Sequence, residues 1–327
     1  MKAMLVDREK RLVWSEVPDP VPKKGEVLVR ICAAGVNRAD LLQREGRYPS
    51  PPGCPEWMGL EIAGVVEKTG EEETRWKPGD RVCALLGGGG YAEYAVVRRD
   101  MLMPVPKGLS LIEAASLPEA YATSYLNLFL EGRLSAGQTA FIPAGGSGLA
   151  SAAIPLAKAF GARVVTSVRS AGTAEKIRSL GADVIVDLAR EKVEDALKRE
   201  EEAGTPVSVS MDCLAGETLG KSLPYMAPGG TWIVISTLAG TETSLNLRPL
   251  LTKGLRLAGS RLRGRTPEEK ACILAELVKN VWPKLEDGTL KPGVTAVFPI
   301  ARAEEAHAVL RRGGHVGKVV LTVGEEE

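Results

Sequence analysis

The sequence predicts an α/β protein in two parts, a β-rich part and a doubly wound parallel sheet covered by helices. In the first ~115 residues, short apolar runs alternate with glycine and proline, which is typical of an irregular barrel or sandwich. From about residue 135, continuous apolar runs alternate with helical periodicity, which is typical of βαβ units. After about residue 265 the chain is too short to build its own core, so we expect it to return to the β-rich part.

The strands of the β-rich part are short. They are predicted at residues 27–31, 62–66, 81–86 and 91–97. The five cysteines of the chain are scattered singly, without a Cys-x-x-Cys pair that would bind a metal, and we expect reduced, buried thiols. They are Cys32, Cys54, Cys83, Cys213 and Cys272.

The second part alternates strictly between strands and helices. Five strands are predicted at residues 139–143, 163–168, 183–187, 206–212 and 231–236. The helices between them are predicted at residues 149–160, 174–180, 191–202 and 218–226. This alternation favours a Rossmann-type doubly wound sheet.

The C-terminal segment has its own pattern of elements. A helix is predicted at 267–282, a strand at 294–300, a helix at 303–311 and a last strand at 318–323. We therefore expect one domain to consist of residues 1–118 and 265–327, and the other of residues 119–264.

Length, charge and composition exclude several classes of protein. The 327 residues suit two domains of about 150 residues. A net charge of +1 gives no field to attract nucleic acid. No apolar run reaches the roughly 20 residues of a membrane span, and the start at Met1 lacks the regions of a signal peptide, so we expect a cytoplasmic protein. Asparagine and glutamine are scarce while Glu, Arg and Pro are abundant, a bias that suits a thermophile.

A glycine-rich loop lies between the first strand and the first helix of the second part. Glycine lets the backbone turn tightly and approach a pyrophosphate, which then binds at the helix N-terminus. Such a loop can be an ordinary flexible turn, but this one follows a strand, opens a helix and precedes a second strand that ends about 20 residues later. We therefore expect a dinucleotide at Gly145, Gly146, Ser147, Gly148 and Leu149.

The end of the second strand indicates which dinucleotide binds. NAD-binding sites place Asp or Glu there, which accepts hydrogen bonds from the ribose and repels a 2′-phosphate. Here Ser167, Arg169 and Ser170 stand at this end, and the first acid is Glu175. A guanidinium and hydroxyls suit a phosphate, so the sequence favours NADPH over NADH. Lys176 would add charge, although solvation on the helix surface is the simpler interpretation.

Three stretches of the N-terminal part resemble the zinc-independent quinone oxidoreductases, the zeta-crystallin-like branch of the medium-chain dehydrogenase/reductase superfamily. They are Gly-Val-Asn-Arg-Ala-Asp-Leu at 35–41, Gln-Arg-Glu-Gly-Arg-Tyr-Pro at 43–49 and Gly-Leu-Glu-Ile-Ala-Gly at 59–64. The resemblance covers essentially the whole chain. It implies a GroES-like β-rich domain, completed by the C-terminal tail, together with a Rossmann domain.

The resemblance also bears on metals. Zinc alcohol dehydrogenases of the same superfamily have a metal-binding Cys where this chain has Asn37, and a His where it has Leu60. The four cysteines of their structural zinc lobe are absent, and the short turn at 87–90 takes that place. The two histidines, His307 and His315, are interpreted as surface or packing residues. We expect no metal.

The resemblance implies that Asn37, Asp40 and Tyr48 line the pocket beside the nicotinamide. Hydride transfer to a quinone leaves negative charge on oxygen, which the Asn37 amide or the Tyr48 hydroxyl would stabilise. Asp40 would orient Asn37 or the nicotinamide. The structural alternative is that Asn37 and Asp40 only cap a short helix.

The family pattern implies further cofactor contacts. Thr123 would lie near the nicotinamide. On another segment, the cofactor would contact Ser260, Arg261 and Leu262. The chain departs from the family at Thr173 and Leu188, near the places where a lysine-rich helix start and a tyrosine often hold the adenosine phosphate. We expect Arg169 to bind the adenosine phosphate in their place.

Together these observations predict an NADPH-dependent quinone reductase. One alternative is an NADPH-dependent reductase of 2-alkenals or enones on the same scaffold, and another is a weakly catalytic NADPH-binding sensor or structural protein. The expected partners are a small-molecule substrate and a second copy of the chain. The homodimer would form through the sheet edge near Leu255 to Leu262, where an apolar β-like segment would expose an open edge.

Overall fold

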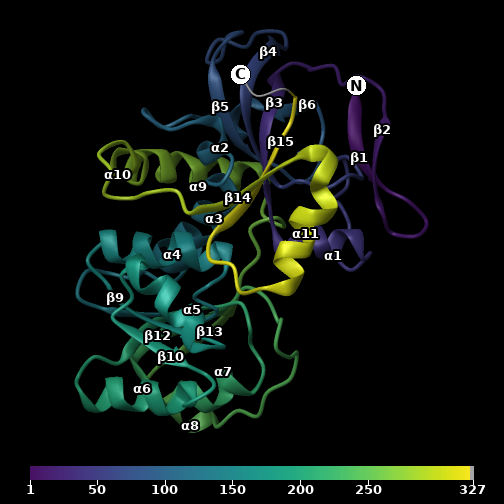
Figure 1. The fold of residues 1–327 in the computed structure, drawn as a ribbon. Coiled ribbons are helices and arrows are strands. Elements are labelled where there is room, and N and C mark those ends of the chain that lie inside the picture. Colours follow the sequence, from purple (N-terminus) through teal and green to yellow (C-terminus); the bar gives the residue numbers. More distant parts are fainter. Residues whose placement is uncertain (325–327) are drawn as a thin grey trace. The chain divides into compact units, whose positions relative to one another are not determined.

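The computed structural model describes residues 1–324, and the chain forms two compact units (Figure 1). The first unit combines Met1–Ala122 with the chain from Arg263 onward, and the second is Thr123–Leu262. Each unit has its own main sheet, and the first unit also has a two-stranded one.

A seven-stranded sheet organises the first unit. Its order is β14-β15-β3-β4-β5-β7, and β6 also pairs with β3. The strands are β3 (Glu26–Val36), β4 (Glu61–Thr69), β5 (Arg81–Leu85), β6 (Tyr94–Arg98), β7 (Leu102–Pro104), β14 (Val294–Pro299) and β15 (Lys318–Thr322). β15 pairs antiparallel with β3, with Val319 opposite Val36, so the C-terminal segment completes the sheet of the β-rich unit as the sequence predicted.

A hairpin and short helices surround this sheet. The hairpin is β1 (Lys2–Val6) and β2 (Leu12–Glu16). The helices of this unit are α1 (Arg38–Arg44), α2 (Leu111–Ala114), α9 (Pro267–Asn280), α10 (Trp282–Glu286) and α11 (Ala303–Arg312), with 3₁₀ turns η1 (Arg99–Met101) and η5 (Ile300–Arg302). The helix predicted at 267–282 is therefore two helices, because the first ends at Asn280 with Val281 as its C-cap, and Pro283 lies in the first turn of the next.

The second unit is a parallel sheet in the order β10-β9-β8-β11-β12-β13. The strands are β8 (Thr139–Ile142), β9 (Arg163–Val168), β10 (Val184–Asp187), β11 (Val207–Asp212), β12 (Met226–Val234) and β13 (Arg256–Gly259). The order reverses between β8 and β11, and ligands of such sheets bind beyond the carboxyl ends of the strands at this point. The glycine-rich loop directly follows β8.

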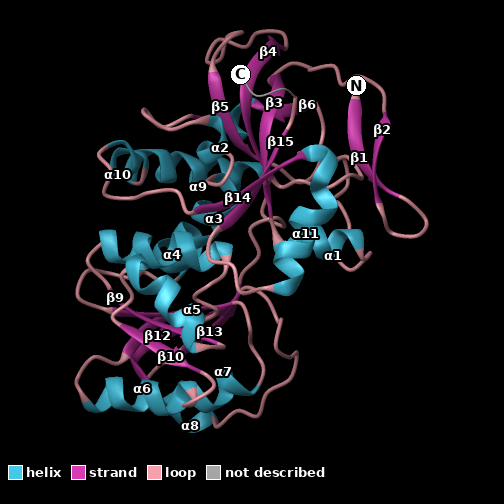
Figure 2. Cartoon of the chain, in the orientation of Figure 1, coloured by secondary structure: helices cyan, strands magenta, loops and turns pink. Residues whose placement is uncertain are grey.

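Helices cover both faces of the parallel sheet (Figure 2). They are α4 (Gly148–Ala159), α5 (Ala171–Ile177), α6 (Val193–Glu202), α7 (Glu217–Ser222) and α8 (Leu247–Thr252), with turns η3 (Arg178–Leu180) and η4 (Leu223–Tyr225). α3 (Pro118–Tyr125) and the π-helix η2 (Leu126–Glu131) lead into the sheet. Ile154 of α4 packs into one apolar core and Leu197 of α6 into the other. The predicted doubly wound sheet is confirmed.

The sheet has a sixth strand besides the five predicted ones: β13, which lies within the apolar β-like segment expected at the sheet edge near Leu255 to Leu262. This strand has four residues, and Leu257 within it is 42% exposed. It pairs on one side only, with β12, as expected of an edge strand.

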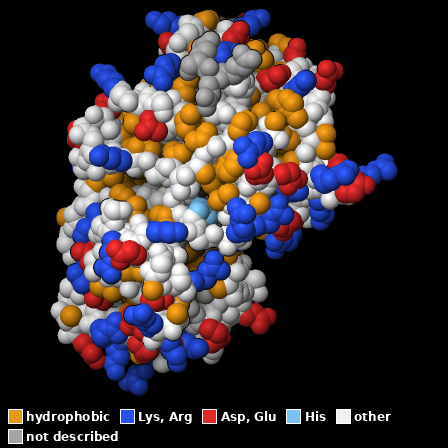
Figure 3. All heavy atoms as spheres, viewed as in Figure 1, with side chains coloured by type: hydrophobic (Ala, Val, Ile, Leu, Met, Phe, Trp, Pro, Cys, Tyr) orange, Lys and Arg blue, Asp and Glu red, His pale blue; other side chains and the backbone are white. Residues whose placement is uncertain are grey.

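The cysteines also differ from expectation. All five are free, but only Cys83 is buried and Cys272 is exposed on α9. No helix within residues 1–324 has the length and apolar character needed to span a bilayer. On the face seen in Figure 3, basic and acidic side chains are interspersed, in keeping with the net charge of +1.

Candidate active site

The loop after β8 has an unusual backbone. Ala144 adopts a φ of 56°, in the left-handed region that side chains other than glycine rarely occupy. Gly145 has another role: a Cβ there would lie 2.5 Å from Thr166 Oγ1 and 2.8 Å from Ile177 Cδ1. Its N–H donates to Ser167 O at 2.9 Å. The tight turn is therefore made at Ala144, and Gly145 allows the loop to lie close against β9 and α5.

The same loop ends on the N-terminus of α4. Ser147 is the N-cap, and its Oγ accepts the N–H of Ala150 at 3.1 Å. The backbone N–H groups of Gly148 and Leu149 have no acceptor in the part of the chain that the structure describes. Unpaired N–H groups and the positive end of the helix dipole suit an anion such as a pyrophosphate.

The end of β9 carries the residues predicted for a 2′-phosphate. Arg169 and Ser170 are exposed, whereas Ser167 is 1% exposed and points into the unit. Ser170 caps α5, and its Oγ lies 3.1 Å from Thr173 Oγ1. Within residues 1–324, Arg169 forms no ion pair, so its guanidinium is available to a ligand. After β9 the chain thus presents the exposed guanidinium of Arg169 and the neighbouring hydroxyls of Ser170 and Thr173, whereas the hydroxyl of Ser167 is buried.

The other predicted cofactor residues are spread over the second unit. Thr123 is half-buried, and its carbonyl accepts Asn127 Nδ2 at 2.7 Å. Lys176 and Arg261 are exposed, while Leu262 is buried. Ser260 follows β13, and its N–H donates to Val234 O at 3.0 Å.

In the first unit, the Asn37 side chain is held by a buried ion pair. Lys318 Nζ lies 2.5 Å from Glu61 Oε1 and donates to Asn37 Oδ1 at 2.6 Å. Asn37 Nδ2 in turn donates to Glu61 Oε1 at 2.9 Å, and its second contact, with Gly35 O, is long at 3.4 Å. Glu119 N donates to Glu61 Oε2 at 2.8 Å. Both ends of the Asn37 amide are therefore engaged within the protein.

Asp40 is fully buried below Asn37. It accepts the backbone N–H of Asn37 at 2.7 Å, the N–H of Gly59 at 3.1 Å and the Tyr91 hydroxyl at 3.2 Å. The Asn37 contact is the carboxylate half of a capping box on α1, but the Asn37 side chain points to Glu61 and Lys318. Asp40 thus orients Asn37 through its backbone.

The buried chain of polar groups continues to His307. The Tyr91 hydroxyl lies 3.3 Å from His307 Nε2, and the two rings meet edge to face. His307 is fully buried, which confirms the packing interpretation for this histidine.

Burial changes the acidity of these groups in opposite senses. Loss of water raises the pKa of Asp40 to about 6, although the N–H donors of Asn37 and Gly59 oppose the rise. Burial, reinforced by the charges of Arg44 and Arg311, lowers the pKa of His307 to about 3. At neutral pH the histidine is uncharged and the carboxyl is ionised.

Tyr48 lies beside a second buried cation. Arg263 Cζ lies 4.6 Å from the centroid of the Tyr48 ring, and Arg263 Nη1 donates to Tyr48 O at 3.3 Å. The guanidinium is anchored on Gly87 O at 2.6 and 2.8 Å and on Gln43 Oε1 at 2.9 Å.

Comparison with known proteins identifies the family. The model of the alcohol dehydrogenase GroES-like domain matches residues 23–107, and the model described as zinc-binding dehydrogenase matches residues 148–279. A quinone oxidoreductase of Sus scrofa is 31% identical over 310 residues, which cover 94% of this chain and 92% of that protein. The chain belongs to the medium-chain dehydrogenase/reductase superfamily.

Solved structures of medium-chain reductases are similar over the full length. The quinone oxidoreductase of Thermus thermophilus, solved also in complex with NADPH, is 31% identical with a TM-score of 0.82 and covers 98% of this chain and 100% of its own. The JamJ enoyl reductase is 26% identical with a TM-score of 0.87, covering 99% of each chain. The relatives thus include reductases of two kinds.

A zinc ion does not fit the residues of this medium-chain reductase at Asn37. The one amide oxygen already accepts the Lys318 ammonium, whose positive charge would repel a metal ion. Leu60 offers no ligand atom. No cluster of three or more His, Cys, Asp or Glu suited to a metal occurs among residues 1–324.

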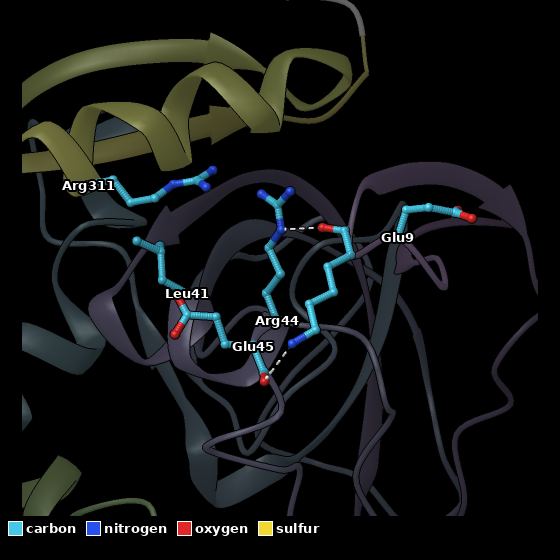
Figure 4. Close-up of a pocket in the computed structure, with 6 residues that line it drawn as sticks. Glu9, Leu41, Arg44, Glu45 and Arg311 are labelled. Carbon is cyan, nitrogen blue, oxygen red and sulfur yellow. Dashed lines mark hydrogen bonds between the residues drawn. The ribbon is translucent and has the colours of Figure 1, made fainter.

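A polar pocket of about 220 Å³ lies between α1, α11 and the β1–β2 turn (Figure 4). Arg311 projects from α11 above Leu41 and Arg44 of α1. Arg44 already forms a two-pronged ion pair with Glu304 at 2.6 and 2.8 Å and donates to Lys10 O at 2.6 Å. Because its charges are compensated, we assign no ligand to this pocket.

The residues that hold the predicted ones in place were not predicted from the sequence. These are Glu61, Tyr91, Arg263, His307 and Lys318. Lys318 had a detectable signal, since it is the one charged residue of an otherwise apolar predicted strand. Arg263 gave none, because the run 261–265 has three arginines that the sequence does not distinguish.

Proposed function

We propose that this protein is an NADPH-dependent, zinc-independent reductase that transfers a hydride to a quinone. The choice of NADPH rests on the residues that follow β9. The exposed Arg169 and the hydroxyls of Ser170 and Thr173 lie there, where an NAD-binding site has an acid. Support for the acceptor comes from the quinone oxidoreductases at about 31% identity.

In this proposal, different residues bind the cofactor and the substrate. Gly148 and Leu149 N–H groups bind the pyrophosphate, and Arg169 binds the 2′-phosphate. Bound NADPH supplies the hydride. Tyr48 then donates a hydrogen bond to the substrate oxygen as it gains negative charge, because the Asn37 amide already donates to Glu61. Asn37 would face the substrate, and the buried Asp40 would hold Asn37 in place through its backbone N–H.

A titration with both reduced nucleotides tests the cofactor. We expect NADPH to bind at least 10-fold more tightly than NADH, and Arg169→Gln to abolish this preference by weakening NADPH binding about 10- to 100-fold. Arg178→Gln is the matched control, because Arg178 lies in the turn after α5 and is paired with Glu175. This variant should keep the preference for NADPH over NADH. Equal binding of both nucleotides by the parent protein contradicts the assignment.

Turnover separates the candidate acceptors. A planar quinone and a 2-alkenal are compared, each with saturating NADPH, and the proposal expects faster turnover of the quinone. Faster turnover of the alkenal favours the enone reductase, which the similarity to the JamJ enoyl reductase supports. Binding of NADPH with no turnover of either indicates a sensor or structural protein.

We also propose a homodimer formed through the outer edge of β13. Leu257 in β13 is 42% exposed, and Leu247 and Leu251 of α8, the helix that precedes β13, are 65% and 84% exposed. An unpaired parallel edge next to exposed leucines favours pairing with a second copy.

A further inference from the structure

Arg263 is a buried cation without a carboxylate partner. The residue is 8% exposed, and no Asp or Glu in the described part of the chain forms an ion pair with it. Its hydrogen-bond acceptors are the neutral oxygens of Gly87, Gln43 and Tyr48. Buried charges are ordinarily paired with an opposite charge. Because this one is not, its electrostatic effect on the neighbouring groups is not cancelled by a carboxylate.

The residue beside it is Tyr48. At 4.6 Å from the ring centroid, the guanidinium forms a cation–π contact with the ring while also binding the Tyr48 carbonyl. Lys270 Nζ donates to Arg263 O at 2.9 Å and fixes the backbone of Arg263. Arg263 is thus rigid on both its main chain and its side chain.

The loop that carries Tyr48 is tied to the same anchor. Gln43, which accepts from Arg263, donates through Nε2 to Ser50 Oγ at 2.9 Å and to Glu56 O at 2.8 Å. The guanidinium also binds Gly87 O, on the turn that follows β5. Arg263 is therefore the point at which the loop, the turn and the returning chain meet.

We propose that Arg263 is a positioning residue that fixes the Tyr48 ring and favours acceptors whose oxygen becomes negative. This rests on the proposed function, in which Tyr48 donates to the substrate oxygen. A quinone that accepts a hydride becomes a hydroquinone anion and then takes one proton from water. The positive charge over the Tyr48 ring makes the Tyr48 hydroxyl a stronger hydrogen-bond donor and stabilises the anion that this hydroxyl would contact.

Kinetics of Arg263 variants test the proposal. In Arg263→Ala we expect kcat for the quinone to fall about 10- to 100-fold while the Kd for NADPH changes less than about 2-fold. Guanidinium ion at about 10 mM restores part of the lost kcat by filling the cavity, and Arg263→Lys is intermediate because an ammonium cannot stack flat and reach three acceptors. Arg75→Ala, which removes an exposed arginine stacked 5.1 Å from Trp76, leaves kcat unchanged and shows no rescue.

A second measurement does not depend on turnover. Fluorotyrosine incorporation places a ¹⁹F label on the six tyrosines, and Tyr48→Phe identifies the Tyr48 signal. We expect this signal to shift in Arg263→Ala and to return toward its original position with guanidinium. If the parent protein reduces no quinone, the proposed function fails, whereas the ¹⁹F signal still decides the positioning role. An unshifted signal, or kcat loss matched by equal loss of NADPH binding, overturns the inference.

Discussion

Lys318 Nζ lies 2.5 Å from Glu61 Oε1, and both side chains are at most 5% exposed. One residue opens the last strand of the sheet and the other opens β4, so the pair joins segments 257 residues apart. All three donors of the ammonium are used, on Glu61, Asn37 and Val36. A pair so fully hydrogen-bonded escapes much of the desolvation cost that makes buried ion pairs unfavourable.

Removing one partner of this pair is expected to destabilise the protein strongly. Lys318→Met leaves the Glu61 carboxylate buried without its counterion, and we expect a loss of about 3–5 kcal/mol in the free energy of unfolding, measured by urea denaturation. Glu61→Gln in the same chain should recover part of this loss, because no buried charge then remains. Lys198→Met breaks an exposed pair with Glu202 and should change stability by less than about 0.5 kcal/mol. A loss below about 1 kcal/mol for Lys318→Met contradicts the role given to the pair.

The shifted pKa values of Asp40 and His307 predict opposite responses to pH. The folded protein keeps the Asp40 proton up to about pH 6, above the ordinary value of 3.8, so the stability from Asp40 is present in acid and lost as pH rises. His307 stays neutral down to about pH 3, below its ordinary 6.5, so its stability is present at neutral pH and lost as pH falls. Between about pH 4 and 6 the two effects cancel in the parent protein.

Single variants should reveal each effect. In His307→Gln the free energy of unfolding should fall as pH rises from about 4 to 6, and in Asp40→Asn it should fall as pH drops over the same range, relative to the parent. Each slope should be about 1.4 kcal/mol per pH unit, the value for one proton. Urea denaturation at a series of pH values measures it. Slopes of the same sign in both variants are incompatible with the assignment.

The glycine-rich loop offers a pair of opposite substitutions. Ala144→Gly relieves a left-handed alanine and should stabilise the protein by about 0.5–1 kcal/mol, because the left-handed cost exceeds the entropy that glycine loses on folding. Gly145→Ala introduces a Cβ 2.5 Å from Thr166 Oγ1, and should cost about 1–3 kcal/mol. Thermal unfolding measures both, and NADPH titration should show weaker binding for Gly145→Ala alone. If Ala144→Gly destabilises, the strain at this position is not relieved by glycine.

Local patterns explain what the sequence predicted of the fold. The strands β8, β9 and β11 are almost entirely buried, and each combines several apolar residues with only small polar ones at its inner positions, a pattern that the sequence displays. β13 has only four residues and pairs on one side, so its segment was expected as a β-like sheet edge but was not counted among the parallel strands. The break between α9 and α10 lies at Val281, two residues before Pro283, but the helical periodicity of 267–282 outweighed this proline in our prediction.

The candidate site was predictable only where its residues are neighbours in sequence. The loop at 144–150, Arg169 with Ser170, and Asn37 with Asp40 each form a short motif with a local consequence. Lys318 meets Asn37 across 281 residues, and Arg263 meets Gln43 across 220. No pattern within a window of sequence specifies such contacts, because the pairing of strands and the return of the tail create them.

The proposed dimer predicts a monomeric variant. Leu257 of β13 is 42% exposed and Leu251 of α8 is 84% exposed, so a second copy paired along this edge would remove both from water. Light scattering of the parent protein should give about twice the 34.8 kDa of one chain. Leu257→Lys places a charge on the edge and should give single chains at the same concentration, while Val21→Lys, at a 73% exposed position of the other unit, should leave the dimer intact. A parent protein that scatters as one chain at every concentration removes the dimer and leaves the exposed leucines without a partner.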